Sequence, residues 1–124
     1  MSSKTALEIP PSLWRNYRPF RLNENQRLAA SIVTEARRVA KCIADELINR
    51  FGSKRVVLFG SLARGNFNRW SDIDLAVWGI PPADFYRAVA FASGFSDVLK
   101  VDIVDVDDCP KALCEIILQE GIEL

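Results

Sequence analysis

Hydrophobic residues recur at two different periods along the chain, and the change of period predicts where helices and strands lie. Between residues 23 and 51 the apolar positions return every three or four residues, the period of an amphipathic helix. Asn23 is suited to cap this helix and Gly52 to end it. At about 1.5 Å per residue the helix would be roughly 40 Å long, so we expect it to break or to project toward a partner. The apolar positions are Leu28, Ile32, Ala36, Val39, Ile43, Leu47 and Phe51.

Two segments that follow have the pattern of strands. Residues 55–59 form a β-branched apolar run that ends at Gly60, which is typical of a buried strand, and a turn or short helix must come next. Residues 72–78 alternate acidic and apolar positions, so that Asp72 and Asp74 share one face of a strand. The other face carries Ile73, Leu75 and Val77.

Residues 98–106 form the third predicted strand, and alternation assigns its acids to faces. Because Leu99, Val101 and Ile103 must share the apolar face, Asp102 lies on the other one. If this strand pairs beside residues 72–78, Asp102 joins the two earlier acids. We interpret Asp105 and Asp107 as strand-end or capping residues.

Two shorter helices complete the predicted domain. Residues 83–93 follow a Pro-Pro pair and precede Gly94, and residues 110–119 carry a helical apolar stripe that stops at Gly121. We therefore divide the chain into an N-terminal arm, 1–22, and one domain, 23–124, made of the long helix 23–51 and a core, 52–124. The arm interleaves aromatic residues with arginines, a pattern that suits packing onto its own domain, or binding of single-stranded nucleic acid or a protein. These residues are Trp14, Tyr17 and Phe20 with Arg15, Arg18 and Arg21.

Length and charge limit the classes of function. The 124 residues are 49% hydrophobic and 26% charged, the composition of one globular domain. The formal net charge is zero, yet residues 1–21 are basic and residues 97–124 are acidic. This balance argues against an extensive nucleic-acid surface. No apolar run approaches the roughly 20 residues that cross a bilayer, so no membrane association is expected.

The three cysteines are informative about the redox state of the cell compartment and give no sign of a metal site. Cys42, Cys109 and Cys114 leave one thiol unpaired in any disulfide scheme, and no secretory hydrophobic segment follows the start. We expect a reducing, cytoplasmic environment and small, buried or half-buried thiols. The chain has no histidine and no CxxC pair, so a zinc site lacks ligands.

The candidate chemistry lies between residues 60 and 74. Gly60 lets the backbone approach a ligand closely, and Ser61 offers a hydroxyl and amide donors at a predicted helix start, which together favour phosphate binding. Asp72 and Asp74 would point the same way, and such proximity is costly unless a divalent cation or a proton compensates it. A solvated acidic strand face is the structural alternative. Together with Asp102, these residues provide the three carboxylates and the phosphate-binding backbone that two-metal phosphoryl or nucleotidyl transfer requires.

This pattern resembles that of a known family. The runs Gly60-Ser61, Ala63-Arg64-Gly65 and Ser71-Asp72-Ile73-Asp74-Leu75 are similar to those of the minimal nucleotidyltransferases of the DNA polymerase β superfamily, many of which are antitoxins to HEPN-type ribonucleases. The resemblance covers about 51–124, and Asp102 matches the family's third acid. It implies an α+β fold of the polymerase β type, with a small mixed sheet flanked by helices.

The resemblance also implies roles for the acids. Asp72 and Asp74 would hold two Mg²⁺ ions, and Asp102 would hold one of them and orient or deprotonate the attacking hydroxyl. The nucleotide is expected to be ATP, with attack at its α-phosphorus and loss of pyrophosphate.

Four further residues are expected at the nucleotide. Gly60 and Ser61 would hold the β- and γ-phosphates, and Ser71 is counted with the nucleotide-binding residues. Arg64 could neutralise a phosphate or form a structural pair with an acid.

Three functions remain open at this point. The first is transfer of AMP to a hydroxyl of a protein partner, a HEPN-type toxin, which would make the chain the antitoxin of such a pair. The second is a non-catalytic antitoxin that binds and occludes the toxin. The third is nucleotidyl transfer to a small molecule such as an aminoglycoside, for which a chain of this length offers no second domain.

Overall fold

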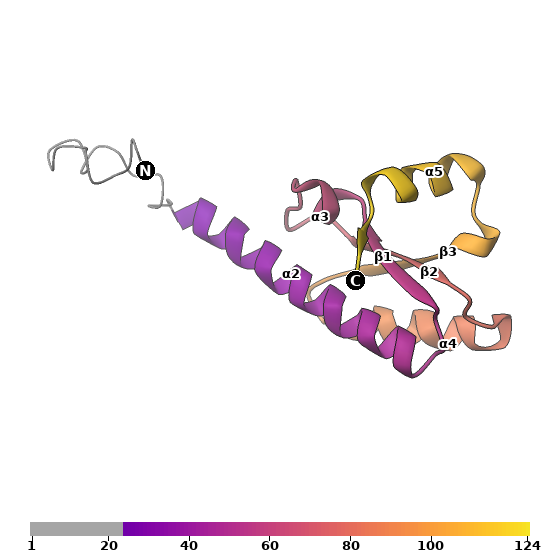
Figure 1. The fold of residues 1–124 in the computed structure, drawn as a ribbon. Helices are drawn as coiled ribbons and strands as arrows, with labels where there is room; N and C mark the ends of the chain where they lie inside the picture. The colour runs from indigo at the N-terminus through magenta and orange to yellow at the C-terminus, as the bar shows by residue number, and fades with distance from the viewer. Residues whose placement is uncertain (1–23) are drawn as a thin grey trace, which may run out of the picture. The chain divides into compact units, whose positions relative to one another are not determined.

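This computed structural model describes residues 24–124, which form a long helix followed by four strands with shorter helices between them (Figure 1). Within it, Ser31–Leu124 form one compact unit. The predicted arm and the cap at Asn23 lie outside the described residues. The elements are α2 (Glu24–Asn49), β1 (Arg55–Phe59), α3 (Ser61–Arg64), β2 (Ile73–Trp78), α4 (Pro82–Ser93), β3 (Val101–Asp105), the 3₁₀ turn η2 (Val106–Asp108), α5 (Lys111–Glu120) and β4 (Ile122–Glu123).

The strands form one mixed sheet in the order β3-β2-β1-β4. β1 pairs antiparallel with β2 and with β4, whereas β2 and β3 run parallel and are joined through α4. The α+β class with a small mixed sheet flanked by helices is therefore confirmed.

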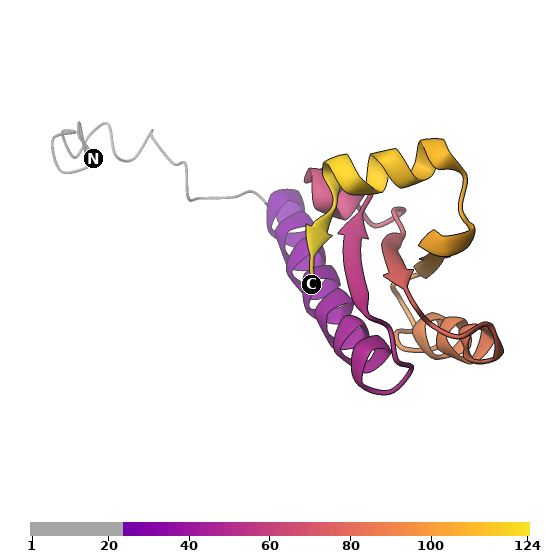
Figure 2. The same cartoon turned by 45° about the vertical axis from the view of Figure 1, so that its right-hand side comes forward.

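Helices cover both faces of this sheet (Figure 2). On one face the buried side of α2, from Ala36 to Leu47, packs with α4 against the apolar face of the strands, which includes Ile73, Leu75 and Val77. On the other face Ile117 of α5 packs against β1 and Ala76 of β2. The predicted alternation of β2 is confirmed within Ile73–Trp78, and Asp74 shares with Ala76 the face that carries α5.

The helix and strand predictions hold with small shifts and one omission. The long helix is one unbroken element of 26 residues, which excludes the first of the two alternatives, a break, while projection toward a partner stays a prediction. β1 has the predicted bounds, β3 is shorter than residues 98–106, and the sequence pattern did not indicate β4. The two residues of β4 pair with Val57 and Leu58, and the Leu124 amide donates to the carbonyl of Val56 at 3.0 Å.

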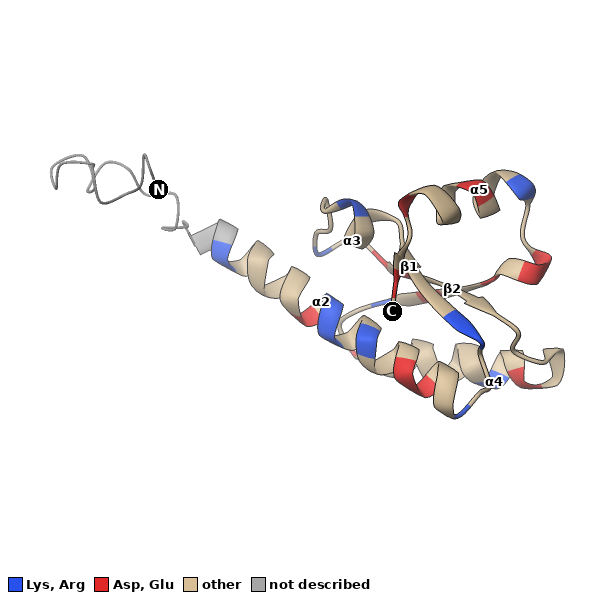
Figure 3. Ribbon diagram, in the orientation of Figure 1, with Lys and Arg blue, Asp and Glu red and all other residues tan. Residues whose placement is uncertain are grey.

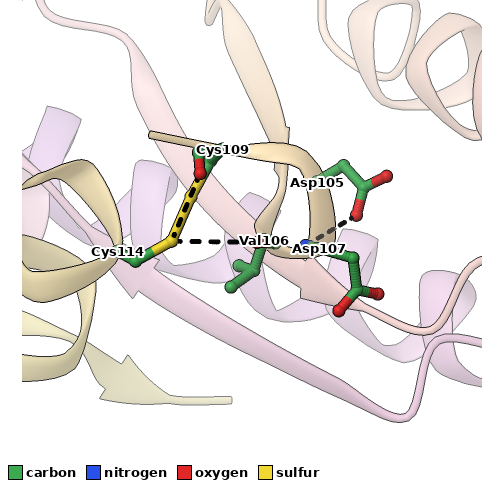
Figure 4. Close-up of a disulfide and its surroundings, with 5 residues drawn as sticks. All are labelled: Asp105, Val106, Asp107, Cys109 and Cys114. Carbon is green, nitrogen blue, oxygen red and sulfur yellow. Dashed lines mark hydrogen bonds between the residues drawn. A yellow bond between two sulfur atoms is a disulfide. The ribbon is translucent and has the colours of Figure 1, made fainter. Parts of the chain in front are cut away.

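A disulfide closes the loop between β3 and α5 (Figure 4). It joins Cys109 to Cys114, so the prediction of free thiols is wrong at these two positions, while Cys42 is a half-buried free thiol. The turn before the disulfide is capped as predicted, since the Asp105 carboxylate accepts from the Asp107 amide at 3.1 Å. The cytoplasmic location inferred from the cysteine count stays a prediction.

Candidate functional site

The sheet register brings the predicted acids together. Asp74 of β2 has Phe59 of β1 as its neighbour on one side and Asp102 of β3 on the other. Asp72 lies just before β2, close enough for its charge to act on both other carboxylates. We call Asp72, Asp74 and Asp102 the carboxylate cluster.

Burial and neighbouring acids make ionisation of Asp74 and Asp102 harder. Burial, followed by the charges of Asp102 and Asp72, raises the pKa of Asp74 from 3.8 to about 6, against the opposing charge of Arg64. Burial also raises the pKa of Asp102, together with the charge of Asp72 and a hydrogen bond with it, while Lys100 opposes the rise. A bound cation would remove this repulsion.

Gly60 is what allows the Asp74 carboxylate to lie where it does. The glycine is buried at the end of β1 with a φ of +78°, a conformation that other residues rarely adopt. A Cβ on Gly60 would overlap Oδ2 of Asp74. The sequence predicts that this glycine lets a ligand approach the backbone. The absent side chain also makes room for the Asp74 carboxylate, a contact that only the three-dimensional pairing shows.

Ser61 and Arg64 are the two ends of α3, which is a single turn. The Ser61 carbonyl accepts from the amides of Gly65 and Asn66 at 2.9 and 3.0 Å, which closes the turn after Gly60. The Arg64 guanidinium forms an ion pair with Glu120 of α5, with 3.2 Å between Nη1 and Oε1. Of the two roles foreseen for Arg64, the structure shows the structural pair, and phosphate binding stays a prediction.

Ser71 closes the turn that leads into the cluster. Its hydroxyl accepts from the Asn68 amide at 3.1 Å, and its own amide donates to the Asn68 carbonyl at 2.9 Å. It also lines a cavity of about 370 Å³ together with Asp72. The serine therefore has a structural function in positioning Asp72, and its contact with nucleotide is untested.

The donor set suits a cation that arrives with phosphates. Within residues 24–124 no group of three or more acidic or cysteine side chains is arranged to hold a metal ion by itself. Mg²⁺ commonly binds through one or two carboxylates and completes its shell with substrate phosphates and water, so it needs no protein cage. The carboxylate cluster, in which the pKa values of Asp74 and Asp102 are raised, fits that mode.

The exposed face of α2 adds little net charge to this region. Figure 3 shows basic and acidic residues interspersed along the helix, where ion pairs join Glu35 to Arg38, Lys41 to Asp45 and Glu46 to Arg50. Exposed pairs of this kind neutralise each other and contribute little to stability. No helix in the described part of the chain combines the length and apolarity needed to cross a membrane.

Comparison with known proteins agrees with this geometry. The family model described as Polymerase beta, Nucleotidyltransferase matches residues 41–124, and no curated protein matches the sequence. A solved structure assigned to the minimal nucleotidyltransferases is 33% identical, with a TM-score of 0.62, and covers 74% of this chain and 95% of its own.

Two toxin–antitoxin structures share the fold. One, solved with AMP-PNP, is 24% identical with a TM-score of 0.58 and covers 67% of this chain and 70% of its own. The other holds a tri-AMPylated HEPN toxin of Shewanella oneidensis with its MNT antitoxin, at 20% identity and a TM-score of 0.51, covering 73% of this chain and 70% of its own. The family match and the structure that is 33% identical show that this chain belongs to the polymerase β nucleotidyltransferases, in their minimal form.

Proposed function

We propose that this protein transfers AMP from Mg²⁺-ATP to a hydroxyl group of a partner protein, as the antitoxin of a HEPN-type toxin. The observation that carries the proposal is the strand register, which sets Asp74 beside Asp102. Gly60 directly follows Phe59, the partner of Asp74 on β1, and Asp72 lies two residues before Asp74. Three carboxylates crowded at the starts of β2 and β3, beside the end of β1, cost stability, which is reasonable where they serve a cation and a phosphate. The likeness to complexes with AMP-PNP and with an AMPylated toxin supports the choice of nucleotide and acceptor.

The residues divide the work by their place on the sheet. Asp72 and Asp74 would hold Mg²⁺, which neutralises the charge that develops on the phosphate oxygens. The backbone at Gly60 and Ser61 would bind the β- and γ-phosphates. Asp102, on the neighbouring strand, would orient the acceptor hydroxyl and take its proton.

The chemical balance of the transfer is that of a single displacement. The acceptor oxygen bonds to the α-phosphorus, the bond from that phosphorus to the bridging oxygen breaks, and pyrophosphate leaves with the electron pair. The product is an AMP ester of the acceptor. Attack and departure occur on opposite sides of the phosphorus, so acceptor and pyrophosphate must approach the cluster from different directions.

A turnover experiment separates a catalyst from a stoichiometric inhibitor. A small molar fraction of this protein, incubated with Mg²⁺-ATP and a HEPN-type ribonuclease that binds it, should silence the ribonuclease completely, because one enzyme modifies many acceptors. Intact-mass spectrometry should show added AMP on the acceptor. Asp72→Ala and Asp102→Ala should abolish the mass shift and still form the complex.

Silencing only at equal molar amounts, with no adduct from the wild-type protein, would mean that the chain acts by occlusion. An adduct on an aminoglycoside and none on the protein would instead favour the small-molecule acceptor.

A further inference from the structure

The cavity that Ser71 and Asp72 line lies on one particular side of the carboxylate cluster. Its lining includes Asp72 and Lys100, the latter just before β3, but neither Gly60 nor Ser61. In the sheet, β3 and β1 flank β2 on opposite sides. The cavity therefore meets the carboxylate cluster at Asp72, and the backbone expected to bind the leaving phosphates lies outside its lining. An in-line acceptor must approach away from those phosphates.

Two strongly exposed apolar side chains line this cavity. Trp70 and Val98 are each 84% exposed, an unusual state for large apolar residues beside a site. The Arg69 guanidinium lies 5.8 Å from the centre of the Trp70 ring. Tryptophan and arginine are enriched among the residues that contribute most to the binding energy of protein interfaces.

A second hollow extends the cavity toward α2. It has a volume of about 290 Å³ and shares Arg69, Val98 and Leu99 with the first, while Ile32 and Glu35 of α2 form its far wall. Because the two hollows share these three lining residues, they adjoin each other and together exceed the space of one side chain. This size suits a polypeptide segment.

The charges of the cavity select among acceptors. Asp72 and Asp97 are balanced by Arg69 and Lys100, and the remaining polar groups are the serines at 71, 93 and 96. A balanced lining gives no net attraction to a polycationic small molecule such as an aminoglycoside. It suits an uncharged hydroxyl.

We propose that this cavity receives the hydroxyl-bearing side chain of the acceptor protein, and that Trp70 and Val98 bind the residues on either side of it. The inference rests on the proposed function and names where its protein substrate binds. Trp70 and Val98 act on acceptor affinity and take no part in binding ATP.

Steady-state kinetics of AMP transfer test this assignment. With a HEPN-type ribonuclease that binds this protein as acceptor, Trp70→Ala and Val98→Ser should each raise the acceptor KM about tenfold. The KM for ATP should stay unchanged. Tyr86→Ala is the matched control, because Tyr86 is 82% exposed on α4 and lines neither hollow.

The outcomes separate this inference from the proposed function. An unchanged acceptor KM overturns the docking assignment, and a raised KM for ATP instead identifies the cavity as part of the nucleotide site. If the wild-type protein transfers no AMP, the proposed function fails, and calorimetry with the same acceptor then decides. Weaker binding by both variants, and not by Tyr86→Ala, would support the surface, and equal binding would refute it.

Discussion

At the scale of single residues, the site combines two unfavourable features that depend on each other. The carboxylate of Asp74 is partly buried among like charges, and it occupies the space that a side chain at Gly60 would need. Neither feature helps the chain to fold. Both place a carboxylate next to backbone that follows a buried strand, which is the arrangement a cation bound to phosphate requires.

Replacing Asp74 should change how stability depends on pH. The folded chain holds the proton of Asp74 more tightly than the unfolded chain does, since its pKa rises from 3.8 to about 6. The contribution of this group is therefore most favourable below pH 3.8 and is lost as the pH rises to about 6. Asp74→Asn should remove that slope and leave the metal-free protein as stable as wild type at neutral pH, or more stable by about 1 kcal/mol after allowance for partial exposure.

Denaturant titrations at several pH values, without metal, measure this effect. Asp45→Asn, on the exposed face of α2, controls for loss of a carboxylate as such. A large loss of stability in Asp74→Asn at neutral pH would show that Asp74 is a structural residue.

Gly52 provides a comparison for Gly60, as a glycine with a positive φ and open surroundings. Gly60 and Gly52 have nearly the same φ, +78° and +77°, but a Cβ on Gly52 meets nothing within 4 Å. Gly52→Ala should cost about 1 kcal/mol from strain alone. Gly60→Ala should cost clearly more and should weaken binding of Mg²⁺-ATP, because it displaces the carboxylate.

A double variant tests the cause. Adding Asp74→Ala to Gly60→Ala should return part of the lost stability, since the overlapping group is gone. Equal costs for the two glycine variants, or strict additivity with Asp74→Ala, would contradict the contact.

The residue-scale predictions from sequence succeeded where alternation decides the answer. Asp102 could be assigned to the face of Asp74 because the apolar residues on either side of it leave one choice. The overlap of Gly60 with Asp74 and the pairing of Arg64 with Glu120 could not be foreseen, because each joins residues far apart in sequence on different elements.

At the scale of elements, the region after β3 departs most from the sequence analysis. β4 has only two residues, too few to show any periodicity, yet it is the edge strand beside β1. Gly121, just before it, has no room for a side chain, because a Cβ there would overlap Val57 and the Ile117 carbonyl. The sequence indicated a helix stop at this glycine but not the close approach of α5 to β1 that requires it.

The disulfide at the start of α5 should contribute measurably to stability. Closing so short a loop lowers the conformational entropy of the unfolded chain, which raises the free energy of unfolding by about 2 kcal/mol. Reduction should lower the free energy of unfolding by about this amount, and a Cys109→Ser/Cys114→Ser variant should be less stable and insensitive to reductant. The measurement is denaturation with and without dithiothreitol.

Titration of thiols in the purified protein provides the check on that expectation. One reactive thiol, from Cys42, is expected before reduction and three after it. Three thiols without reductant, and unchanged stability on adding it, would show that the pair is not joined in solution.

At the scale of the whole molecule, ligand and fold should stabilise each other. Mg²⁺ with ATP should raise the melting temperature, because binding to the folded state alone adds to its stability. Either component alone should have a smaller effect, since the carboxylate cluster needs a cation and the cation needs phosphate oxygens to complete its shell. Asp72→Ala should lose the joint effect, and its persistence in that variant would place the nucleotide elsewhere.

The parallel pairing of β2 with β3 also has a consequence for the order of folding. Antiparallel β1 and β2 can pair directly through the α3 segment, whereas β3 reaches β2 only after the chain has crossed over through α4. Contacts between more distant parts of a chain form more slowly. During refolding, Asp74 should therefore settle over Gly60 before Asp102 arrives, so that recovery of activity lags behind recovery of the helical circular dichroism signal.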